Sequence, residues 1–327
     1  MSRLVLLTGA TGFAGSHVLE ALLAAGHRVR IPVRPQSRLA WIPGAGVERV
    51  PGDLRDPDCL AALVSGASWI FHFGGITRAG RRGDFERINT QGTCDLFDAA
   101  CAAGNDLELF LFCSSLAAGG PAPSPERPRR EEDPATPISA YGRSKLEAER
   151  RLSQRCPSRT RLVMIRPPTV YGPRDTALLV LFRWLAHGIL PMPAPKGSLA
   201  SLIHARDLAQ ACLHLAETRA EGLFYVGDGK LHSWEEVGSV AGGILGKPAR
   251  PLRIPSPLVR LPGIWGEVIT VCTGRAPVIN LDKVRDLLQP YWIVSIDRLL
   301  ATGYAPRVDL AGGLRETVDW YRTEGWL

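Results

Sequence analysis

The stretch TGATGFAG, residues 8–15, is a GxxGxxG pattern that stands between an apolar run at 4–8 and a helical pattern at 15–25. Glycines permit a tight turn and let the backbone approach a pyrophosphate, and the N-terminus of a following helix supplies amide donors. A turn with only a structural role is the alternative. The position between a strand and a helix favours a dinucleotide site. The residues expected to hold the dinucleotide here are Gly9, Thr11, Gly12, Phe13 and Gly15.

Apolar runs alternate with helical patterns as the chain continues from this turn. Strands are expected at 4–8, 28–33, 47–51, 69–73, 109–113 and 161–166, and helices at 15–25, 57–64, 89–103 and 139–153. Alternation at this spacing predicts βαβ units and a parallel sheet with helices on both faces. We therefore predict an α/β fold: a Rossmann-type doubly wound parallel sheet with a smaller C-terminal α/β substrate domain.

The rhythm of strands and helices becomes irregular after Gly172, and residues 191–197 are rich in proline. Segments 201–216 and 223–227 return to sheet and helix patterns. We predict a dinucleotide-binding domain over residues 1–172, with 201–230 returning to it, and a substrate-binding domain built from 173–200 and 231–327. The connection at 119–137 contains six prolines, and long connections in compact domains are usually functional.

The charge of the chain is positive, with 39 Lys and Arg against 32 Asp and Glu and a net charge of +7. All but five of the basic residues are arginines, and they are scattered along the sequence. The densest basic run, Arg127–Arg130, is followed at once by three acidic residues, which is typical of a solvated loop and not of a phosphate-binding patch. We predict a small-molecule substrate and no nucleic-acid partner.

The seven cysteines form no CxxC pair, which indicates reduced thiols and neither a disulfide framework nor a zinc site. The N-terminus lacks the charged and apolar regions of a signal peptide, and no apolar run approaches the roughly 18 residues of a membrane span. These features predict a cytoplasmic protein without an integral membrane segment.

The histidines His72, His204 and His214 never show a metal-like spacing, so we predict no metal site and expect packed or hydrogen-bonded imidazoles. Asp207 is expected to cap a helix. Segment 257–271 is expected to line the substrate pocket, with contact to a membrane surface as the alternative.

The end of the second strand should meet the adenosine ribose, where an acidic residue would bind the 2′-hydroxyl of NAD. Arg34 holds that place and Arg38 follows it. A guanidinium binds a 2′-phosphate in a bidentate manner, so we predict NADP(H) as the cofactor and NAD(H) as the alternative. Against this stands the interpretation that both arginines are solvated surface residues. Asp53 and Leu54 follow the third strand, where a carboxylate can accept a hydrogen bond from the adenine amino group.

A YxxxK pattern, Tyr141 to Lys145, lies on a predicted helix, and Ser115 follows the strand at 109–113. Spacing of four places the phenol and the ammonium on one helix face. A cation there lowers the pKa of the phenol, so Tyr141 could exchange a proton with an alcohol or a carbonyl. Ser115 would hold the substrate oxygen, Lys145 would reach the nicotinamide ribose, and Asn89 could complete a proton relay through water. The alternative is an amphipathic surface helix.

Taken in order, these residues resemble the extended branch of the short-chain dehydrogenase/reductase superfamily. The resemblance covers nearly the whole chain and rests on TGATGFAG (8–15), GDL (52–54), FHFGG (71–75), NTQGT (89–93), Ser115, YGRSK (141–145), RPPTVYGP (166–173) and HARD (204–207). It implies catalytic Ser115, Tyr141 and Lys145 with Asn89 in support. It also implies a homodimer through helices 89–103 and 139–153, and Pro168 and Val170 are assigned to the cofactor site.

Three features narrow the activity that the resemblance implies. Residues 116–118 are Leu-Ala-Ala, where dehydratases carry acidic residues, and Thr169 stands where nucleotide-sugar epimerases usually carry Asn. RPPTVYGP, Arg34 and the stretches 273–277, 291–292 and 303–306 look like the branch of 3β-hydroxysteroid dehydrogenases and dihydroflavonol reductases. The implied enzyme interconverts a secondary alcohol and a ketone on a bulky apolar substrate. A nucleotide-sugar 4-epimerase with tightly bound NAD and a dinucleotide-sensing binding protein are the alternatives.

Overall fold

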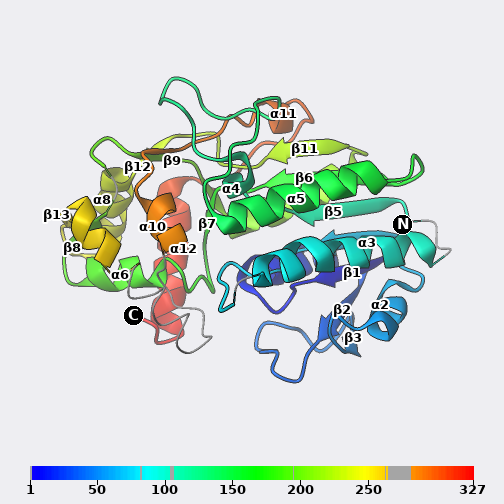
Figure 1. The fold of residues 1–327 in the computed structure, drawn as a ribbon. Coiled ribbons are helices and arrows are strands. Elements are labelled where there is room, and N and C mark those ends of the chain that lie inside the picture. The colour runs from blue at the N-terminus through cyan, green and yellow to red at the C-terminus, as the bar shows by residue number, and fades with distance from the viewer. Residues whose placement is uncertain (1, 82, 104–106, 194, 262, 264–280) are drawn as a thin grey trace.

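The computed structural model describes residues 2–81, 83–103, 107–193, 195–261, 263 and 281–327 (Figure 1). Its centre is a seven-stranded sheet with the order β11-β6-β5-β4-β1-β2-β3, in which every neighbouring pair is parallel. The strands are β1 (Leu4–Thr8), β2 (Arg28–Val33), β3 (Val47–Pro51), β4 (Trp69–His72), β5 (Leu109–Cys113), β6 (Arg161–Arg166) and β11 (Gly222–Tyr225). The predicted Rossmann-type doubly wound sheet is confirmed.

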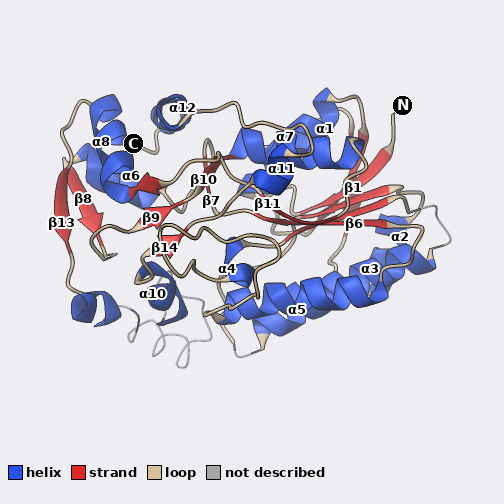
Figure 2. Ribbon diagram, turned by 90° about the horizontal axis from the view of Figure 1, so that it is seen from above, coloured by secondary structure: helices blue, strands red, loops and turns tan. Residues whose placement is uncertain are grey.

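Helices cover both faces of this sheet. Figure 2 shows α1 (Phe13–Ala24) and α7 (Ala205–Glu217) on one face, and α2 (Pro57–Val64), α3 (Gly92–Ala102) and α5 (Ala140–Arg155) on the other. Successive residues of a strand point to opposite faces, so Leu7 packs into the core under α1 and α7 while Leu6 packs into the core under α2, α3 and α5. This two-sided burial is why β1 and β5 are almost entirely apolar.

The order of the sheet reverses beside β1, which pairs with β2 on one side and with β4 on the other. In open parallel sheets, ligands bind at the carboxyl ends of the strands at such a switch point. The glycine-rich turn follows the carboxyl end of β1 directly, so the fold places it at the position where a dinucleotide is expected.

Most of the remaining elements gather beyond the carboxyl ends of the strands (Figures 1 and 2). The short strands are β7 (Thr169–Tyr171) paired with β10 (Leu202–His204), β8 (Ile189–Met192) paired with β13 (Arg250–Arg253), and β9 (Leu199–Ala200) between β12 (His232–Ser233) and β14 (Tyr291–Trp292). The helices are α6 (Leu179–Ala186), α8 (Trp234–Leu245), α10 (Leu281–Leu287), α11 (Asp297–Leu300) and α12 (Leu310–Thr323). A separate hydrophobic cluster that includes Phe182, Leu190 and Leu314 holds several of them together.

The proline-rich connection begins with α4 (Leu116–Gly119) and is anchored to this outer layer. The backbone N–H of Ala122 donates to Tyr291 O at 2.8 Å, and that of Arg129 donates to Ile293 O at 3.0 Å. The guanidinium of Arg129 donates to the carbonyl oxygens of Pro121 and Pro134, at 2.9 and 3.1 Å. The connection is therefore held by its own hydrogen bonds, although it lacks extended regular structure.

Two expectations need correction. The helix expected at 89–103 begins as a π-helical turn, η1 (Glu86–Gln91), and continues as α3, so Asn89 lies in the turn. Asp207 does not cap α7. His204 is the N-cap residue, and Asp207 accepts hydrogen bonds from the backbone N–H groups of Arg307 and Val308 at 3.0 and 2.8 Å.

Other expectations fall on residues that the structure does not describe. The stretch at 273–277 and most of segment 257–271 lie outside the described residues. Within the described ranges, none of the helices combines the length and the apolar character that a membrane crossing requires.

Candidate active site

The glycine-rich turn forms a cradle that larger residues would fill. Gly9 has a φ of 77°, and a Cβ there would lie 2.6 Å from the carbonyl of Phe73. A Cβ on Gly15 would lie 2.1 Å from the carbonyl oxygen of Gly9, so the helix can approach the turn only with glycine at this place. Gly12 is the N-cap residue of α1 and offers no side-chain cap, which leaves the first amides of the helix available to an anion. The turn fits a pyrophosphate.

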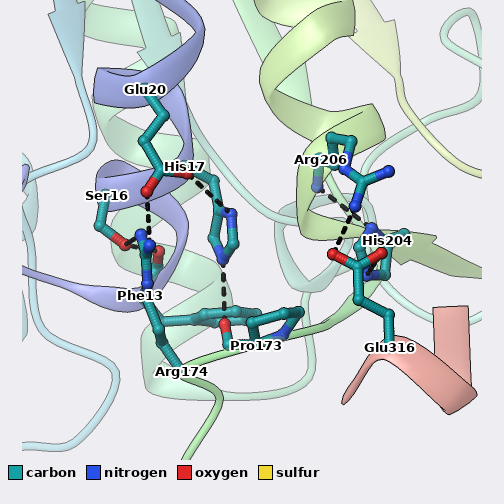
Figure 3. Close-up of polar contacts among 9 residues, drawn as sticks. All are labelled: Phe13, Ser16, His17, Glu20, Pro173, Arg174, His204, Arg206 and Glu316. Carbon is teal, nitrogen blue, oxygen red and sulfur yellow. Dashed lines mark hydrogen bonds and ion pairs between the residues drawn. The ribbon is translucent and has the colours of Figure 1, made fainter. Parts of the chain in front are cut away.

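The helix that starts at this turn is fastened to the segment that leaves β7 (Figure 3). His17 Nε2 lies 2.9 Å from Pro173 O, and burial lowers the pKa of His17, so the neutral imidazole donates this hydrogen bond. Arg174 Nη1 donates to Ser16 Oγ at 3.1 Å, and its other terminal nitrogen pairs with Glu20. These contacts hold the loop around 168–174 against α1.

Two charged groups follow the ends of β2 and β3. Arg34 and Arg38 are exposed, and within the described part of the chain neither guanidinium has an ion-pair partner. Asp53 instead pairs with Arg55, whose Nε and Nη2 donate to its two carboxylate oxygens at 2.9 and 2.8 Å. These hydrogen bonds lower the pKa of Asp53 to about 2. The two arginines are thus free to meet an anion, whereas Asp53 is already held by a cation.

The YxxxK pattern and the strand end meet where α5 crosses the carboxyl end of β5. Ser115 is the N-cap of α4, and its Oγ accepts a hydrogen bond from Ala117 N at 3.1 Å. The Ser115 side chain interacts with the Tyr141 phenol and lowers its pKa. Lys145 Nζ donates to Cys113 O at 2.8 Å, and the Lys145 residue is only 5% exposed. The structure therefore brings together the three side chains that the sequence predicted.

The pKa of Tyr141 is raised, whereas the sequence predicted that it would be lowered. Burial raises the pKa of the phenol, the Cys113 thiol acts in the same direction, and the Ser115 side chain opposes them. Lys145 is not among the groups that shift this pKa, and its ammonium donates a hydrogen bond to the Cys113 carbonyl. Burial also lowers the pKa of Lys145. The phenol is therefore protonated at neutral pH.

Asn89 is fully buried and braces the loop after β4. Its Oδ1 accepts from Ile76 N at 2.8 Å, and its Nδ2 donates to Ile76 O at 2.9 Å. A Cβ added to Gly75 would lie 3.0 Å from Asn89 Oδ1 and 3.5 Å from Lys145 Nζ, so this glycine separates the two side chains. The π-helical turn directs the Asn89 side chain toward this loop, and such turns are frequent at functional sites.

The histidines have packing roles in the described structure. His72 is buried between two threonine hydroxyls, with Thr8 Oγ1 at 2.7 Å and Thr93 Oγ1 at 2.9 Å, and burial lowers its pKa to about 3. His204 Nε2 is buried without a hydrogen-bond partner in the described structure, and burial lowers the pKa of this residue to about 4. Both imidazoles are neutral at physiological pH.

Sequence reasoning missed two residues around the site. Glu149 lies one helical turn beyond Lys145, and it is buried in a bidentate ion pair with Arg166. The continuation of the four-residue spacing was the available signal. Asp286 comes from α10, where it raises the pKa of Tyr141, and burial raises its own pKa to about 6. No local pattern links this carboxyl group to the tyrosine.

A family model described as the NAD-dependent epimerase/dehydratase family matches residues 5–227. The chain belongs to this family. It is an enzyme of the extended short-chain dehydrogenase/reductase superfamily, as the motifs predicted. The family is NAD-dependent, and its match covers the sheet, the glycine-rich turn and the YxxxK helix.

Relatives of the chain differ in activity. It is 33% identical over 326 residues to a ceramide reductase of Caulobacter vibrioides, covering 99% of this chain and 96% of the relative. It is 28% identical to a UDP-glucose 4-epimerase of Vibrio cholerae, covering 98% and 95%. The solved UDP-glucose 4-epimerase of Thermus thermophilus, in complex with NAD, shares the fold with a TM-score of 0.76 at 24% identity, covering 98% and 99%. Family membership therefore includes both reductases and sugar epimerases.

Proposed function

We propose that this enzyme is an NADP(H)-dependent oxidoreductase that interconverts a secondary alcohol and a ketone on a bulky, apolar, steroid- or flavonoid-like substrate. The observation that carries the proposal is the grouping of Ser115, Tyr141 and Lys145 at the carboxyl end of β5. The full-length similarity to a reductase of a lipid supports it. Leu-Ala-Ala after Ser115 and Thr169 after β6 speak against dehydration and epimerisation of a nucleotide sugar.

The cofactor residues follow the carboxyl ends of successive strands. Gly9, Thr11, Gly12, Phe13 and Gly15 would hold the pyrophosphate; Arg34 and Arg38 the 2′-phosphate; Asp53 and Leu54 the adenine; and Pro168, Val170, Tyr141 and Lys145 the nicotinamide end. When bound, the dinucleotide supplies or accepts a hydride at its nicotinamide ring. The exposed arginines without ion-pair partners among the described residues support NADP(H) over NAD(H), because a guanidinium matches a phosphate.

The side chains of the site would position the substrate oxygen and supply the proton that it receives. Ser115 holds the carbonyl oxygen of the ketone, and the protonated Tyr141 donates its proton to this oxygen as the hydride arrives at the carbon. Lys145 would hold the nicotinamide ribose, and Asn89 keeps the loop beside Lys145 in place.

We also propose that the chain has two domains and forms a homodimer. The sheet and its helices, residues 1–172 and 201–230, form the dinucleotide-binding domain, and 173–200 with 231–327 form the substrate-binding domain. A homodimer would form through α3 and α5, which lie side by side on one face of the sheet (Figure 2). Light scattering on a size-exclusion column tests the dimer, and a monomer at micromolar concentration would refute it.

Turnover on defined substrates tests the proposed activity. Long-chain ketones, sterols, flavonoids and UDP-sugars are incubated with NADPH or NADH, and the loss of reduced-cofactor absorbance is followed. We expect turnover of an apolar ketone with NADPH. Isomerisation of a UDP-sugar by protein with tightly bound NAD, without net change in cofactor absorbance, would instead establish the epimerase that the Vibrio cholerae relative exemplifies. Cofactor binding without turnover of any substrate would support a sensor.

A further inference from the structure

Helix α5 contacts the end of β5 through three side chains spaced four residues apart. The contacts join Tyr141 to Ser115, Lys145 Nζ to Cys113 O at 2.8 Å, and Glu149 to the hydroxyl of Ser114. Residues four apart lie on one face of a helix. Three consecutive residues of the strand end are thus each held by one turn of the same helix, and only the first two contacts belong to the YxxxK pattern.

The third contact is made by a carboxylate that is itself firmly held. Glu149 is 4% exposed and Arg166 is 3% exposed. Arg166 Nε and Nη2 donate to the two carboxylate oxygens at 2.9 and 2.6 Å, and Arg166 Nη1 donates to the hydroxyl of Tyr225 at 3.0 Å. A bidentate pair has a fixed geometry, and burial excludes water as a competing partner. The Ser114 hydroxyl therefore donates to a rigid acceptor.

The backbone of the strand end is paired with the neighbouring strand on both sides of Ser115. The backbone N–H of Ser114 donates to Ile165 O at 2.8 Å, and that of Leu116 donates to Pro167 O at 2.9 Å. Arg166 lies between these two acceptors in the sequence. The Glu149–Arg166 pair thus joins α5 to both segments that position Ser115.

We propose that Glu149, held by Arg166, is a positioning residue for the reaction, which fixes Ser115 relative to Tyr141 and Lys145 through the hydroxyl of Ser114. This inference rests on the proposed function. Glu149 also supplies the carboxylate that faces Lys145 from α5. The other groups that face Lys145 are the Cys113 thiol on β5 and the neutral His72 on β4. Tyr141 faces Cys113, Ser115 and the Asp286 carboxyl of α10.

A purely structural ion pair is the competing interpretation, and Ser114→Ala separates the two. This variant removes the hydrogen bond to Glu149 and leaves the ion pair intact. We expect kcat of ketone reduction to fall by about fivefold to tenfold, with cofactor affinity close to wild type and Tm lowered by a few degrees by the loss of one typical buried hydrogen bond. A structural ion pair predicts an unchanged kcat.

A second variant tests the effect of the Glu149 charge on the pKa of Lys145. Glu149→Gln alone would leave Arg166 buried without a counter-ion, so we combine it with Arg166→Met, a replacement of a buried pair that is often neutral for folding. Glu149 raises the pKa of Lys145, and Arg166 is not among the groups that act on it. We expect the basic limb of the kcat–pH profile to move to lower pH. Glu108→Gln, which breaks the Arg3–Glu108 pair at the amino-terminal ends of β1 and β5, is the matched control and should leave the profile unchanged.

Tyr141→Phe in the same assay distinguishes a failure of the positioning role of Glu149 from a failure of the proposed function. If Tyr141→Phe is inactive while Ser114→Ala and the double variant retain the wild-type kcat and pH profile, the positioning role of Glu149 is refuted and the proposed function stands. If Tyr141→Phe is as active as the wild type, the proposed mechanism itself is wrong.

Discussion

Replacing Arg34 by alanine should change which dinucleotide the enzyme selects and little else. The side chain is exposed at the end of β2 and has no ion-pair partner among the described residues. Arg34 makes its hydrogen bonds within the described chain through the backbone: its N–H donates to Ser37 Oγ at 3.0 Å, and its carbonyl oxygen accepts from Ser37 N at 2.9 Å. Because the exposed side chain makes no hydrogen bond or ion pair among the described residues, and only a weak electrostatic interaction with Asp53, Arg34→Ala should unfold at nearly the same temperature as the wild type.

The magnitude follows from the phosphate contact that the guanidinium would make. Hydrogen bonds to charged groups contribute about 1.5–3 kcal/mol, a factor of about 10–150 in affinity. The exposed position allows water and salt to screen the contact, so we expect the lower end, about 10- to 30-fold weaker NADP(H) binding at moderate ionic strength. NAD(H) carries no 2′-phosphate, so its affinity should stay within about twofold. Removing Arg38 as well should increase the effect on NADP(H).

Fluorescence titrations of NADPH and NADH against both proteins measure this selectivity. Arg28→Ala is the matched control, because Arg28 is an exposed arginine at the opposite, amino-terminal end of the same strand. Arg28→Ala removes the same net charge as Arg34→Ala, but the side chain that it removes lies away from the expected ribose site. The affinity of Arg28→Ala for either dinucleotide should therefore equal that of the wild type. Equal NADPH affinity in Arg34→Ala and the wild type would refute the assignment of this residue to the 2′-phosphate.

Three further predictions concern the turn, the tyrosine and a buried histidine. Gly15→Ala should weaken dinucleotide binding at least about tenfold in titrations, because its Cβ would lie 2.1 Å from a carbonyl oxygen of the turn. The control Gly44→Ala, whose Cβ would meet nothing within 4 Å, should bind the dinucleotide normally. Asp286→Asn removes a carboxyl group that raises the pKa of Tyr141, so the tyrosine limb of the kcat–pH profile should move to lower pH; an unmoved limb would contradict this. His232 is hydrogen-bonded to two carboxylates, which raise its pKa above 6.5, so its stabilising effect is complete below that pH and is lost as the pH rises through the raised pKa. The Tm advantage of the wild type over His232→Gln should shrink accordingly, and a constant advantage would exclude this linkage.

The central sheet could be predicted because burial on both faces leaves a strong pattern. The expected strands at 109–113 and 161–166 coincide with β5 and β6. The outer layer could not be predicted in the same way, since β9, β12 and β14 have two residues each and are defined by pairing between distant segments. The π-helical turn before α3 was missed because the side-chain pattern of a helix continues through it.

The site was predictable where its residues follow strand ends or keep a helical spacing. Ser115, Tyr141 and Lys145 lie at such positions, and the structure places them together. The pKa shifts of the site residues could not be predicted from the sequence. The expected effect of Lys145 on the phenol depended on where its ammonium points, and only the fold shows that it donates to the Cys113 carbonyl. Asp286 reaches the site from a helix far along the chain, through a tertiary contact that no local motif encodes.

The most direct test of the account is the rate of hydride transfer in a single turnover, measured for the wild type and Tyr141→Phe with saturating NADPH and the ketone that the substrate panel identifies. The account predicts that the variant binds NADPH within about twofold of the wild type and transfers hydride about 10²- to 10⁴-fold more slowly, the usual contribution of a general acid. Hydride transfer at the wild-type rate in Tyr141→Phe would contradict it.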